Sequence, residues 1–335
     1  MDDAPLAAVL IAEEEFPGID LHAHDAWLVR DGAVWLVAEA GDEIVVGRVA
    51  EDPARVFAER RRWPVPRAGR GHGFASPLPD GGLAVSGGDT VTVYAASGQV
   101  RWTYEHQPWA DQRTASAACT ADASGHRLIA TMAGPMEAGE PYGGDLCVAL
   151  DLSDGRRLRE AVLPSASAGY VFQQSLTDPG RLLLNAAQGD TFFSLVVTST
   201  QGVLRAEPLG LDDELFAGVG MHGAVLKLDV GGAWLSRYEP GRADVSVDAE
   251  DVLPEDLVFA GHRPGFLDEG RVLVAVAEEQ GSAETRHVIL DGRTLHPVAE
   301  LDYPGTDCFD PLALGDGTWL TVEGDTVRRW RTGAH

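Results

Sequence analysis

Short apolar segments separated by polar, glycine-containing turns run along the whole chain. The stretch 90–105 shows this pattern most clearly, with an apolar run at 91–94, a polar turn around Gly98, and a second run at 100–104 that carries Trp102 and Tyr104. β-Branched and aromatic residues favour strands, and glycine adopts the backbone conformations that tight turns require. The pattern therefore predicts pairs of antiparallel strands rather than helices.

A turn of this kind recurs at a regular distance. Seven glycines each lie between two apolar runs, with a mean spacing of about 47 residues, between the lengths of WD40 and kelch repeats. They are Gly32, Gly81, Gly125, Gly180, Gly223, Gly270 and Gly317. A chain of 335 residues accommodates seven such repeats.

A second turn follows the third strand of most repeats, for example at Gly98, Gly155 and Gly202. Four strands joined in this way form an antiparallel blade, and several blades around an axis form a β-propeller. We therefore predict an all-β, seven-bladed β-propeller that occupies residues 1–335 as a single domain. The chain after Gly317 is too short for a full blade, so we expect the apolar run 6–12 to supply the missing strand and close the ring. The absence of alternating helices and strands disfavours a TIM barrel or a doubly wound sheet.

Two of these repeats resemble a known family. Segment 94–102 (YAASGQVRW) resembles the PQQ-like and WD40-like β-propeller repeats, in which a strand, a small-residue turn with glycine, and a tryptophan-bearing strand recur. Segment 148–156 (VALDLSDGR) resembles the same repeat. The resemblance implies the propeller fold. It implies no particular activity, since most members of that superfamily do not bind the quinone.

The charge of the chain limits its partners. Asp and Glu number 52 against 26 Lys and Arg, which gives a net charge of −26. Such a surface repels polyanions, so we expect no nucleic-acid partner. No apolar run approaches the roughly 18 residues of a membrane span, and the N-terminus lacks the basic lead of a secretory signal. We therefore expect a cytoplasmic protein without a membrane partner. Its three cysteines show no CxxC spacing and are expected to be buried free thiols.

Segment 17–24 (PGIDLHAH) resembles the PGxxDxHxH opening of the metal-dependent amidohydrolases, in which two histidines bind a catalytic metal. Alternation along a strand would place His22 and His24 on one face, so they are the candidate metal ligands. That family also needs eight helices, further ligands at later strand ends and a bridging lysine, whereas the only lysine here is Lys227. We interpret the match as coincidental.

Residues 218–223 (GVGMHG) match the GxGxxG spacing of dinucleotide sites. Such a site requires a helix after the glycines, because the helix N-terminus faces the pyrophosphate. An apolar, strand-like run at 224–230 follows instead. We therefore expect these glycines to allow close packing near the propeller axis.

Polar residues gather where the first strand of each repeat begins, which in a propeller is the mouth of the axial channel. Histidines and carboxylates there can act as acid and base or bind a divalent metal. They can equally line a water-filled pore or satisfy backbone groups at blade junctions, and we favour this interpretation. The catalytic candidates are His24, His72, His262 and Asp310. The full set is His22, His24, Asp25, His72, Gln173, Gln174, His262, Asp307 and Asp310.

Two further segments are candidate contact surfaces. Segment 132–145 is the longest Gly/Pro-rich loop, and it either covers a ligand or contacts a partner through Met136 and Tyr142, or is a flexible insertion. The basic run 60–62 with Trp63 suits an anionic partner, but more often such a run is the solvated outer edge of a blade, which we favour. The candidate ligand- or partner-binding residues are Asp25, Gln173, Gln174, Tyr142, Arg61 and Trp63.

These patterns favour a binding or interaction module without catalysis of its own, which uses the channel mouth and the loops of one face. Its expected partner is a protein or a small molecule, and we predict no cofactor; the sequence indicates no oligomeric state. The alternative is a metal-assisted lyase or hydrolase with a histidine and carboxylate site at the channel, centred on His24, His72 and His262 and using a divalent metal. Streptogramin lyases and gluconolactonase-like enzymes are propellers with such sites, by analogy of fold alone.

Overall fold

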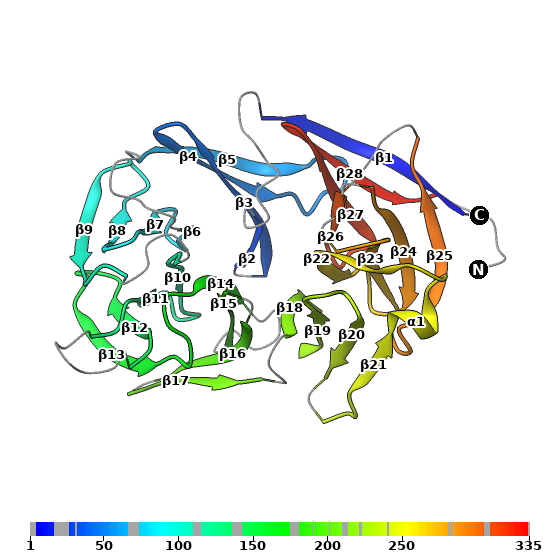
Figure 1. Ribbon diagram of the computed structural model, residues 1–335. Coiled ribbons are helices and arrows are strands. Elements are labelled where there is room, and N and C mark those ends of the chain that lie inside the picture. The colour runs from blue at the N-terminus through cyan, green and yellow to red at the C-terminus, as the bar shows by residue number, and fades with distance from the viewer. Residues whose placement is uncertain are drawn as a thin grey trace. The chain divides into compact units, whose positions relative to one another are not determined.

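The structure is a computed structural model (Figure 1) that describes residues 5–16, 27–30, 32–65, 74–109, 115–135, 143–174, 181–189, 191–200, 202–209, 214–220, 223–239, 241–280, 282, 284–304 and 309–333. Strands β1 to β28 and one short helix, α1 (Ala249–Val252), make up the secondary structure of these ranges. No helix within them is long and apolar enough to cross a membrane.

By the density of its internal contacts the chain divides into two compact units. Unit 1 comprises residues 1–24, 48–59 and 214–335, and unit 2 comprises residues 25–47 and 60–213. The expectation of a single domain over residues 1–335 stays a prediction.

Unit 2 is built from four antiparallel sheets of four strands each, and the order of strands in each sheet follows their order in the chain. The turn between the third and fourth strands of the first sheet belongs to unit 1. The strands are β2 (Trp27–Arg30), β3 (Ala33–Ala40), β4 (Glu43–Val49) and β5 (Phe57–Pro64); β6 (Ala75–Pro77), β7 (Leu83–Ser86), β8 (Thr90–Tyr94) and β9 (Val100–Glu105); β10 (Cys119–Ala121), β11 (Arg127–Met132), β12 (Leu146–Asp151) and β13 (Arg157–Val162); and β14 (Gly169–Gln174), β15 (Arg181–Gln188), β16 (Thr191–Thr200) and β17 (Val203–Pro208).

Unit 1 holds three more sheets of four strands, the last two of which are joined edge to edge. Their strands are β18 (Glu214–Val219), β19 (Val225–Asp229), β20 (Trp234–Tyr238) and β21 (Val245–Asp248); β22 (Val258–Phe266), β23 (Arg271–Ala277), β24 (Arg286–Asp291) and β25 (Pro297–Asp302); and β26 (Phe309–Ala313), β27 (Thr318–Glu323), β28 (Thr326–Thr332) and β1 (Leu6–Glu15). Seven four-stranded antiparallel sheets among the described residues confirm the predicted class, an all-β fold of propeller blades.

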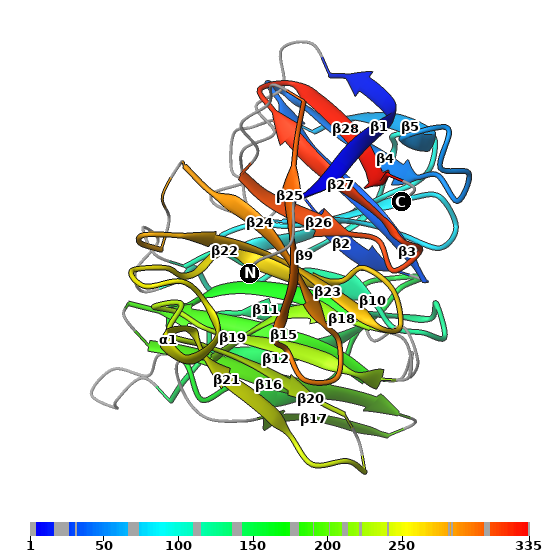
Figure 2. The same ribbon diagram turned by 90° about the vertical axis from the view of Figure 1, so that its right-hand side faces the viewer.

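The N-terminal strand completes the last sheet, as its apolar run predicted. β1 pairs antiparallel with β28 from Ala8 to Glu15, and its first residues pair in parallel with β25 through Leu6 and Leu301. Figure 2 shows β1 beside both strands. The first strand of the chain therefore belongs to the same sheet as the last three.

The glycines of the predicted first turn lie between the first and second strands of their sheets. At Gly81 the backbone φ is +80°, and its N–H donates to the Leu78 carbonyl at 2.9 Å, a conformation that glycine adopts without steric cost. Gly180 lies outside the described residues. The other members of the set are Gly32, Gly125, Gly223, Gly270 and Gly317. The sequence period therefore marks the first turn correctly in the six sheets whose turn glycine is described.

Within each unit, hydrophobic cores lie between consecutive sheets. The core between the second and third sheets of unit 2 contains Trp102, Leu128 and Leu150, and the core between the last two sheets of unit 1 contains Leu273 and Trp319. Central strands such as β7 and β12 are buried on both faces, whereas outermost strands such as β9 and β13 are largely exposed. This difference explains why only the inner strands have continuous apolar sequences.

Two tryptophans connect neighbouring sheets of unit 2. Trp63 on β5 donates from Nε1 to the Ala95 carbonyl at 3.3 Å, and Trp102 on β9 donates to the Leu152 carbonyl at 3.0 Å. Each acceptor directly follows the third strand of the next sheet. A Cβ at Gly155 would lie 2.7 Å from the Trp102 ring, so the turn requires glycine there. These tryptophans serve packing between blades, as the sequence indicated.

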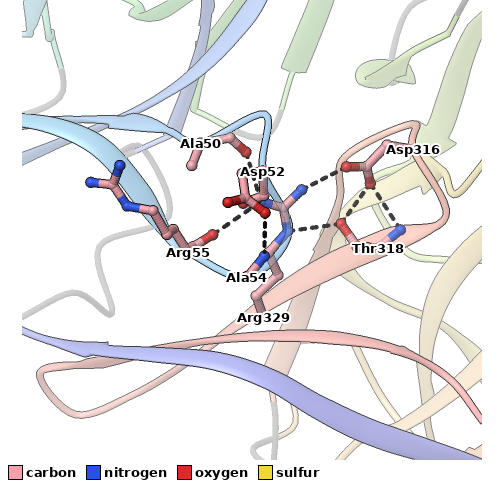
Figure 3. A network of polar contacts seen from close by, with 7 residues as sticks. All are labelled: Ala50, Asp52, Ala54, Arg55, Asp316, Thr318 and Arg329. Carbon is pink, nitrogen blue, oxygen red and sulfur yellow. Dashed lines mark hydrogen bonds and ion pairs between the residues drawn. The ribbon is translucent and has the colours of Figure 1, made fainter.

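A buried arginine fastens the β4–β5 turn to the last sheet within unit 1 (Figure 3). Arg329 on β28 is 1% exposed, and it donates to Thr318 Oγ1 at 3.0 Å and to Asp316 Oδ2 at 2.6 Å. It also donates to three backbone carbonyls of the turn, at 2.6, 3.3 and 3.1 Å: those of Ala50, Asp52 and Arg55. A charge is stable in a protein interior only with such partners, so this network is structural.

Candidate functional site

Several of the candidate site residues lie outside the described residues. They are His22, His24, Asp25, His72, Tyr142 and Asp307, and Met136 of the long loop is a further one. The candidate metal ligands and most of the proposed channel-mouth set therefore stay predictions.

Two of the predicted catalytic candidates come together in unit 1. His262 lies on β22 and Asp310 on β26, the first strands of the last two sheets. The backbone N–H groups of His262 and Arg263 both donate to Asp310 Oδ1, at 3.2 and 3.1 Å. Both strands are irregular at this point, since their pairing registers shift between Ala260 and Gly265 and between Phe309 and Leu312. Bulges of this kind re-aim side chains and are common beside functional sites.

The backbone around Asp310 adopts uncommon conformations. Asp310 has a φ of +47°, which few residues other than glycine adopt, and Gly261 has a φ of +72°. A Cβ at Gly261 would lie 2.5 Å from Asp310 Oδ1, so only glycine fits there. The Gln280 side chain donates from Nε2 to the Gly261 carbonyl at 2.9 Å. The bulges of β22 and β26 are thus held in a fixed, strained arrangement, which points to function.

The side chains at this site differ in exposure. The Asp310 side chain is buried, with its Oδ2 4.0 Å from the Nε of Arg263, whose side chain is 14% exposed. His262 is exposed. The contact of His262 with Asp310 is made by its backbone N–H, and an exposed imidazole can donate or accept hydrogen bonds to a ligand. No group of three or more His, Cys, Asp and Glu residues that could hold a metal ion occurs in the described part of the chain.

The glycine-rich segment beside this site serves packing, as predicted. A Cβ at Gly218 would lie 2.4 Å from the Pro264 carbonyl oxygen, and one at Gly220 would lie 2.5 Å from the Phe266 ring. Strand β19 follows these glycines instead of a helix. The segment therefore brings β18 against β22 and does not form a dinucleotide site.

The two glutamine candidates lie on β14 in unit 2. Gln173 Oε1 accepts the Val29 N–H at 3.0 Å, and Gln174 is 3% exposed. The neighbouring Arg30 on β2 is also 3% exposed and donates to Ser76 Oγ and to the Phe172 carbonyl, both at 3.2 Å. The first strand of the first sheet therefore contacts the first strand of the fourth sheet through polar groups.

The basic run lies on β5, the outermost strand of the first sheet. Arg61 donates to the Gly81 carbonyl at 3.0 Å, and Arg62 pairs with Glu43 at 3.0 Å, both at exposed positions. Trp63 is 2% exposed, so its side chain faces the core and not the solvent. This placement agrees with the outer-edge interpretation of the run.

Sequence reasoning missed Arg263, Gln280 and Arg30. Arg263 is the neighbour of a selected histidine, so its position carried a signal. No sequence signal marks Arg30 or Gln280. Arg30 contacts Phe172 and Gln280 contacts Gly261, and both partners are distant in the sequence.

Comparison with known proteins shows the fold. No family model matches the chain, and no curated protein matches it. Among solved structures it is similar to virginiamycin B lyase from Staphylococcus aureus, with a TM-score of 0.55 and 13% identity over 96% of this chain and 99% of that one. It is also similar to the Cps50 (Swd1) β-propeller domain of Myceliophteria thermophila, with a TM-score of 0.56 and 11% identity over 97% and 100%. A chain of the mitotic checkpoint complex matches with a TM-score of 0.57 and 10% identity over 100% and 98%. The chain therefore has a β-propeller fold, which lyases and interaction proteins share.

Proposed function

We propose that this chain is a non-catalytic binding propeller that recognises a protein or small-molecule ligand at the bulges of β22 and β26. The observation that carries the proposal is the strained, buried anchor at Asp310, which fixes Gly261, His262 and Arg263 in place. Rigid sites bind with a smaller loss of conformational entropy than mobile loops. The exposed His262 is the contact residue in this proposal.

The hydrogen bonds of Asp310 favour binding over catalysis. Its Oδ1 accepts two backbone N–H groups, and the residue is 8% exposed, so the carboxylate positions the bulge of β22 instead of facing solvent. One of the similar structures is a chain of the mitotic checkpoint complex, which supports protein binding as a use of this fold. The net charge of −26 supports a partner that is neither nucleic acid nor anionic membrane, and we place the protein in the cytoplasm without a cofactor.

A matched pair of histidine variants tests this proposal. His262→Glu changes the proposed contact residue, and His296→Glu changes an exposed histidine in the β24–β25 turn of the same unit. Tagged wild-type chain and both variants are purified from the native cell extract, and retained proteins and small molecules are quantified by mass spectrometry. We expect a specific component that His262→Glu loses and His296→Glu retains. Identical retention by all three chains would contradict the proposal.

A second candidate function is a metal-assisted lyase or hydrolase. It is favoured by the position of His262 and Asp310 on two first strands, where the His262 backbone N–H donates to Asp310, and by the fold shared with a lyase, of which a catalytically inactive variant was solved with quinupristin. The metal would need His22 and His24, with His72 as a further group, since the described residues offer no cluster of three ligands. Protein purified without a histidine tag would then contain stoichiometric Zn, Mn or Mg, which His24→Ala would lose. A metal content below a tenth of an equivalent would remove this candidate.

A further inference from the structure

A solvent-open cavity of about 190 Å³ lies between the third and fourth sheets of unit 2, and all its described lining residues belong to that unit. Strands β11 to β13 and the β16–β17 hairpin contribute this lining. Pockets for drug-sized molecules measure about 300–1,000 Å³, so this cavity suits a smaller ligand.

Part of the lining is apolar. Ala149 and Leu204 are 2% and 8% exposed and belong to the hydrophobic core that the third and fourth sheets share, and Leu158 packs against this core. Val203 also lines the cavity and is 40% exposed. Because burial of apolar area is favourable, these side chains can bind the hydrocarbon part of a ligand.

Arg127 on β11 contributes accessible hydrogen-bond donors in a fixed position. Its Nη1 donates to Ser199 Oγ at 3.1 Å and to the Thr200 carbonyl at 2.9 Å, and it lies 3.8 Å from Asp122 Oδ2. Its Nε and Nη2 are not buried and make no hydrogen bond within the described residues. One nitrogen therefore holds the guanidinium in place, while the other two can donate to a ligand.

Arg159 on β13 contributes a second guanidinium. Its Nε donates to the Gly202 carbonyl at 3.4 Å and its Nη1 to the Leu158 carbonyl at 2.6 Å. It forms no ion pair with a carboxylate in the described part of the chain, since the neighbouring Glu160 pairs with Arg157. An exposed arginine of this kind presents a planar set of donors that matches a carboxylate group.

The two arginines contrast with the composition of the chain. Acidic residues outnumber basic ones by 52 to 26, yet both charged residues of the described lining are arginines. Gln201, which lies between the two strands of the hairpin and outside the described residues, carries no charge. The described lining therefore favours an anionic group beside an apolar one.

We propose that this cavity binds a small organic carboxylate, whose carboxylate group pairs with Arg159 and Arg127 and whose body contacts the apolar lining. Because Asp122 already balances Arg127, one positive charge is left, which favours a monoanion over a dianion. The proposal does not depend on the candidate site at His262.

Three probes of one shape and different charge test the class of ligand. Benzoate is an anion at pH 7, benzamide is neutral, and benzamidine is a cation. Titrations of the full chain by ligand-observed NMR can detect the roughly millimolar affinity of so small a ligand. Benzoate should bind saturably, and benzamide about tenfold more weakly, because it lacks the charge-assisted hydrogen bonds. Tightest binding of benzamidine would show that carboxylates dominate the cavity, Asp178 of the undescribed segment 175–180 included, and would overturn the proposal. Absence of saturable benzoate binding would overturn it as well.

A peptide probe separates a small molecule from the end of a protein chain. Acetyl-Gly-Gly-Phe presents a carboxylate and a phenyl ring on a peptide. We expect it to bind no more tightly than benzoate, because the cavity is small. Clearly tighter binding of the peptide would contradict the small-molecule class.

Matched arginine variants test the role of the guanidinium. Arg159→Met removes the donors of the unpaired arginine, and Arg156→Met removes the same charge from an exposed arginine that pairs with Asp151 at 3.6 Å and is not among the described lining residues. We expect Arg159→Met to weaken benzoate binding at least about tenfold and to leave benzamide binding unchanged, and Arg156→Met to leave both unchanged. Equal effects of the two variants on benzoate, or equal losses of benzoate and benzamide in Arg159→Met, would contradict recognition of the anion by Arg159.

Matched valine variants locate the binding. Val203→Trp places a large ring in the lining, and Val100→Trp places the same ring at an exposed position on β9 outside the described lining. We expect Val203→Trp to weaken benzoate binding at least about tenfold and Val100→Trp to leave it unchanged. If Val203→Trp does not fold, Thr200→Trp, at another exposed lining position, replaces it. Equal affinity in the wild type and in a folded lining variant would contradict this location. His262→Glu should leave benzoate binding unchanged, so failure of the function proposed for unit 1 and failure of this proposal give different results.

Discussion

The two units share one design of four-stranded sheet but differ in charge and in the use of polar side chains. Unit 1 carries 31 acidic and 12 basic residues, a formal charge of −19, whereas unit 2 carries 21 and 14, a formal charge of −7. In unit 1 a buried arginine, Arg329, joins the β4–β5 turn to the last sheet. In unit 2 a buried arginine, Arg30, joins the first strands of the first and fourth sheets.

The two units also use the polar residues of their first strands differently. In unit 1 both inner strands bulge where the His262 backbone meets Asp310, so the candidate site lies at the bulges of two first strands. In unit 2 the polar groups at the inner strands, such as Gln173, are used in contacts between sheets. A repeated blade therefore does not fix where a site forms; local bulges and long loops do.

The largest effect that we predict is loss of the Arg329 network. Arg329→Met leaves three turn carbonyls and Asp316 without this donor, and should lower the free energy of unfolding by about 3–5 kcal/mol. Its neighbour Arg328 pairs with Glu13 and Glu323 at the surface, so Arg328→Met should cost about 0–1 kcal/mol. Urea unfolding measures both, and equal costs would contradict the structural role of Arg329.

Loss of Arg30 should have a smaller effect. Arg30→Met removes donors to Ser76 and to the Phe172 and Val29 carbonyls, and should lower the free energy of unfolding by about 2–3 kcal/mol. Arg61→Met, on the exposed outer strand, should cost less than about 1 kcal/mol. A cost for Arg30→Met above that for Arg329→Met would reverse the order that the hydrogen-bond networks imply.

A pair of glycine variants tests the strain at the candidate site of unit 1. Gly261→Ala brings Cβ to 2.5 Å from Asp310 Oδ1 at a φ of +72°, and should cost about 2–3 kcal/mol. Gly32 has a φ of +69° but no atom within 4 Å of its Cβ, so Gly32→Ala should cost only the backbone part, about 1 kcal/mol. Thermal unfolding compares them, and a difference near zero would show that the space beside Asp310 is not tight.

The smallest effect concerns thiol chemistry in unit 2. Burial raises the pKa of the Cys119 thiol to about 11 and that of Cys147 to about 12, so both stay protonated at pH 8 in the folded chain. Because the unfolded thiols ionise at lower pH, this contribution to stability is present at neutral pH and decreases as pH rises above about 9. A thiol reagent at pH 8 should therefore label neither residue until the protein unfolds. Rapid labelling of either thiol in the folded protein would contradict their burial.

The sequence predicted the repeat because the repeat is local. Gly81 and Gly317 lie in turns whose positions follow from hydrophobic spacing, and the short last repeat predicted the pairing of β1 with β28. The sequence predicted part of the contact between His262 and Asp310. Aligning the repeats placed both residues at first strands, but it did not predict their hydrogen bond. The bulges and the Arg30 and Arg329 networks could not be predicted from the sequence, because they depend on contacts between residues far apart in the chain.

The seven-sheet architecture depends on the pairing of β1 with β28, and hydrogen–deuterium exchange tests it most directly. In that pairing the backbone amides of residues 8–15 are partners of residues 326–332. We expect peptides from both segments to exchange slowly and with similar protection, because they open together. Exchange of the 8–15 amides within seconds, while the 326–332 amides stay protected, would show that the N-terminal strand does not complete the last sheet.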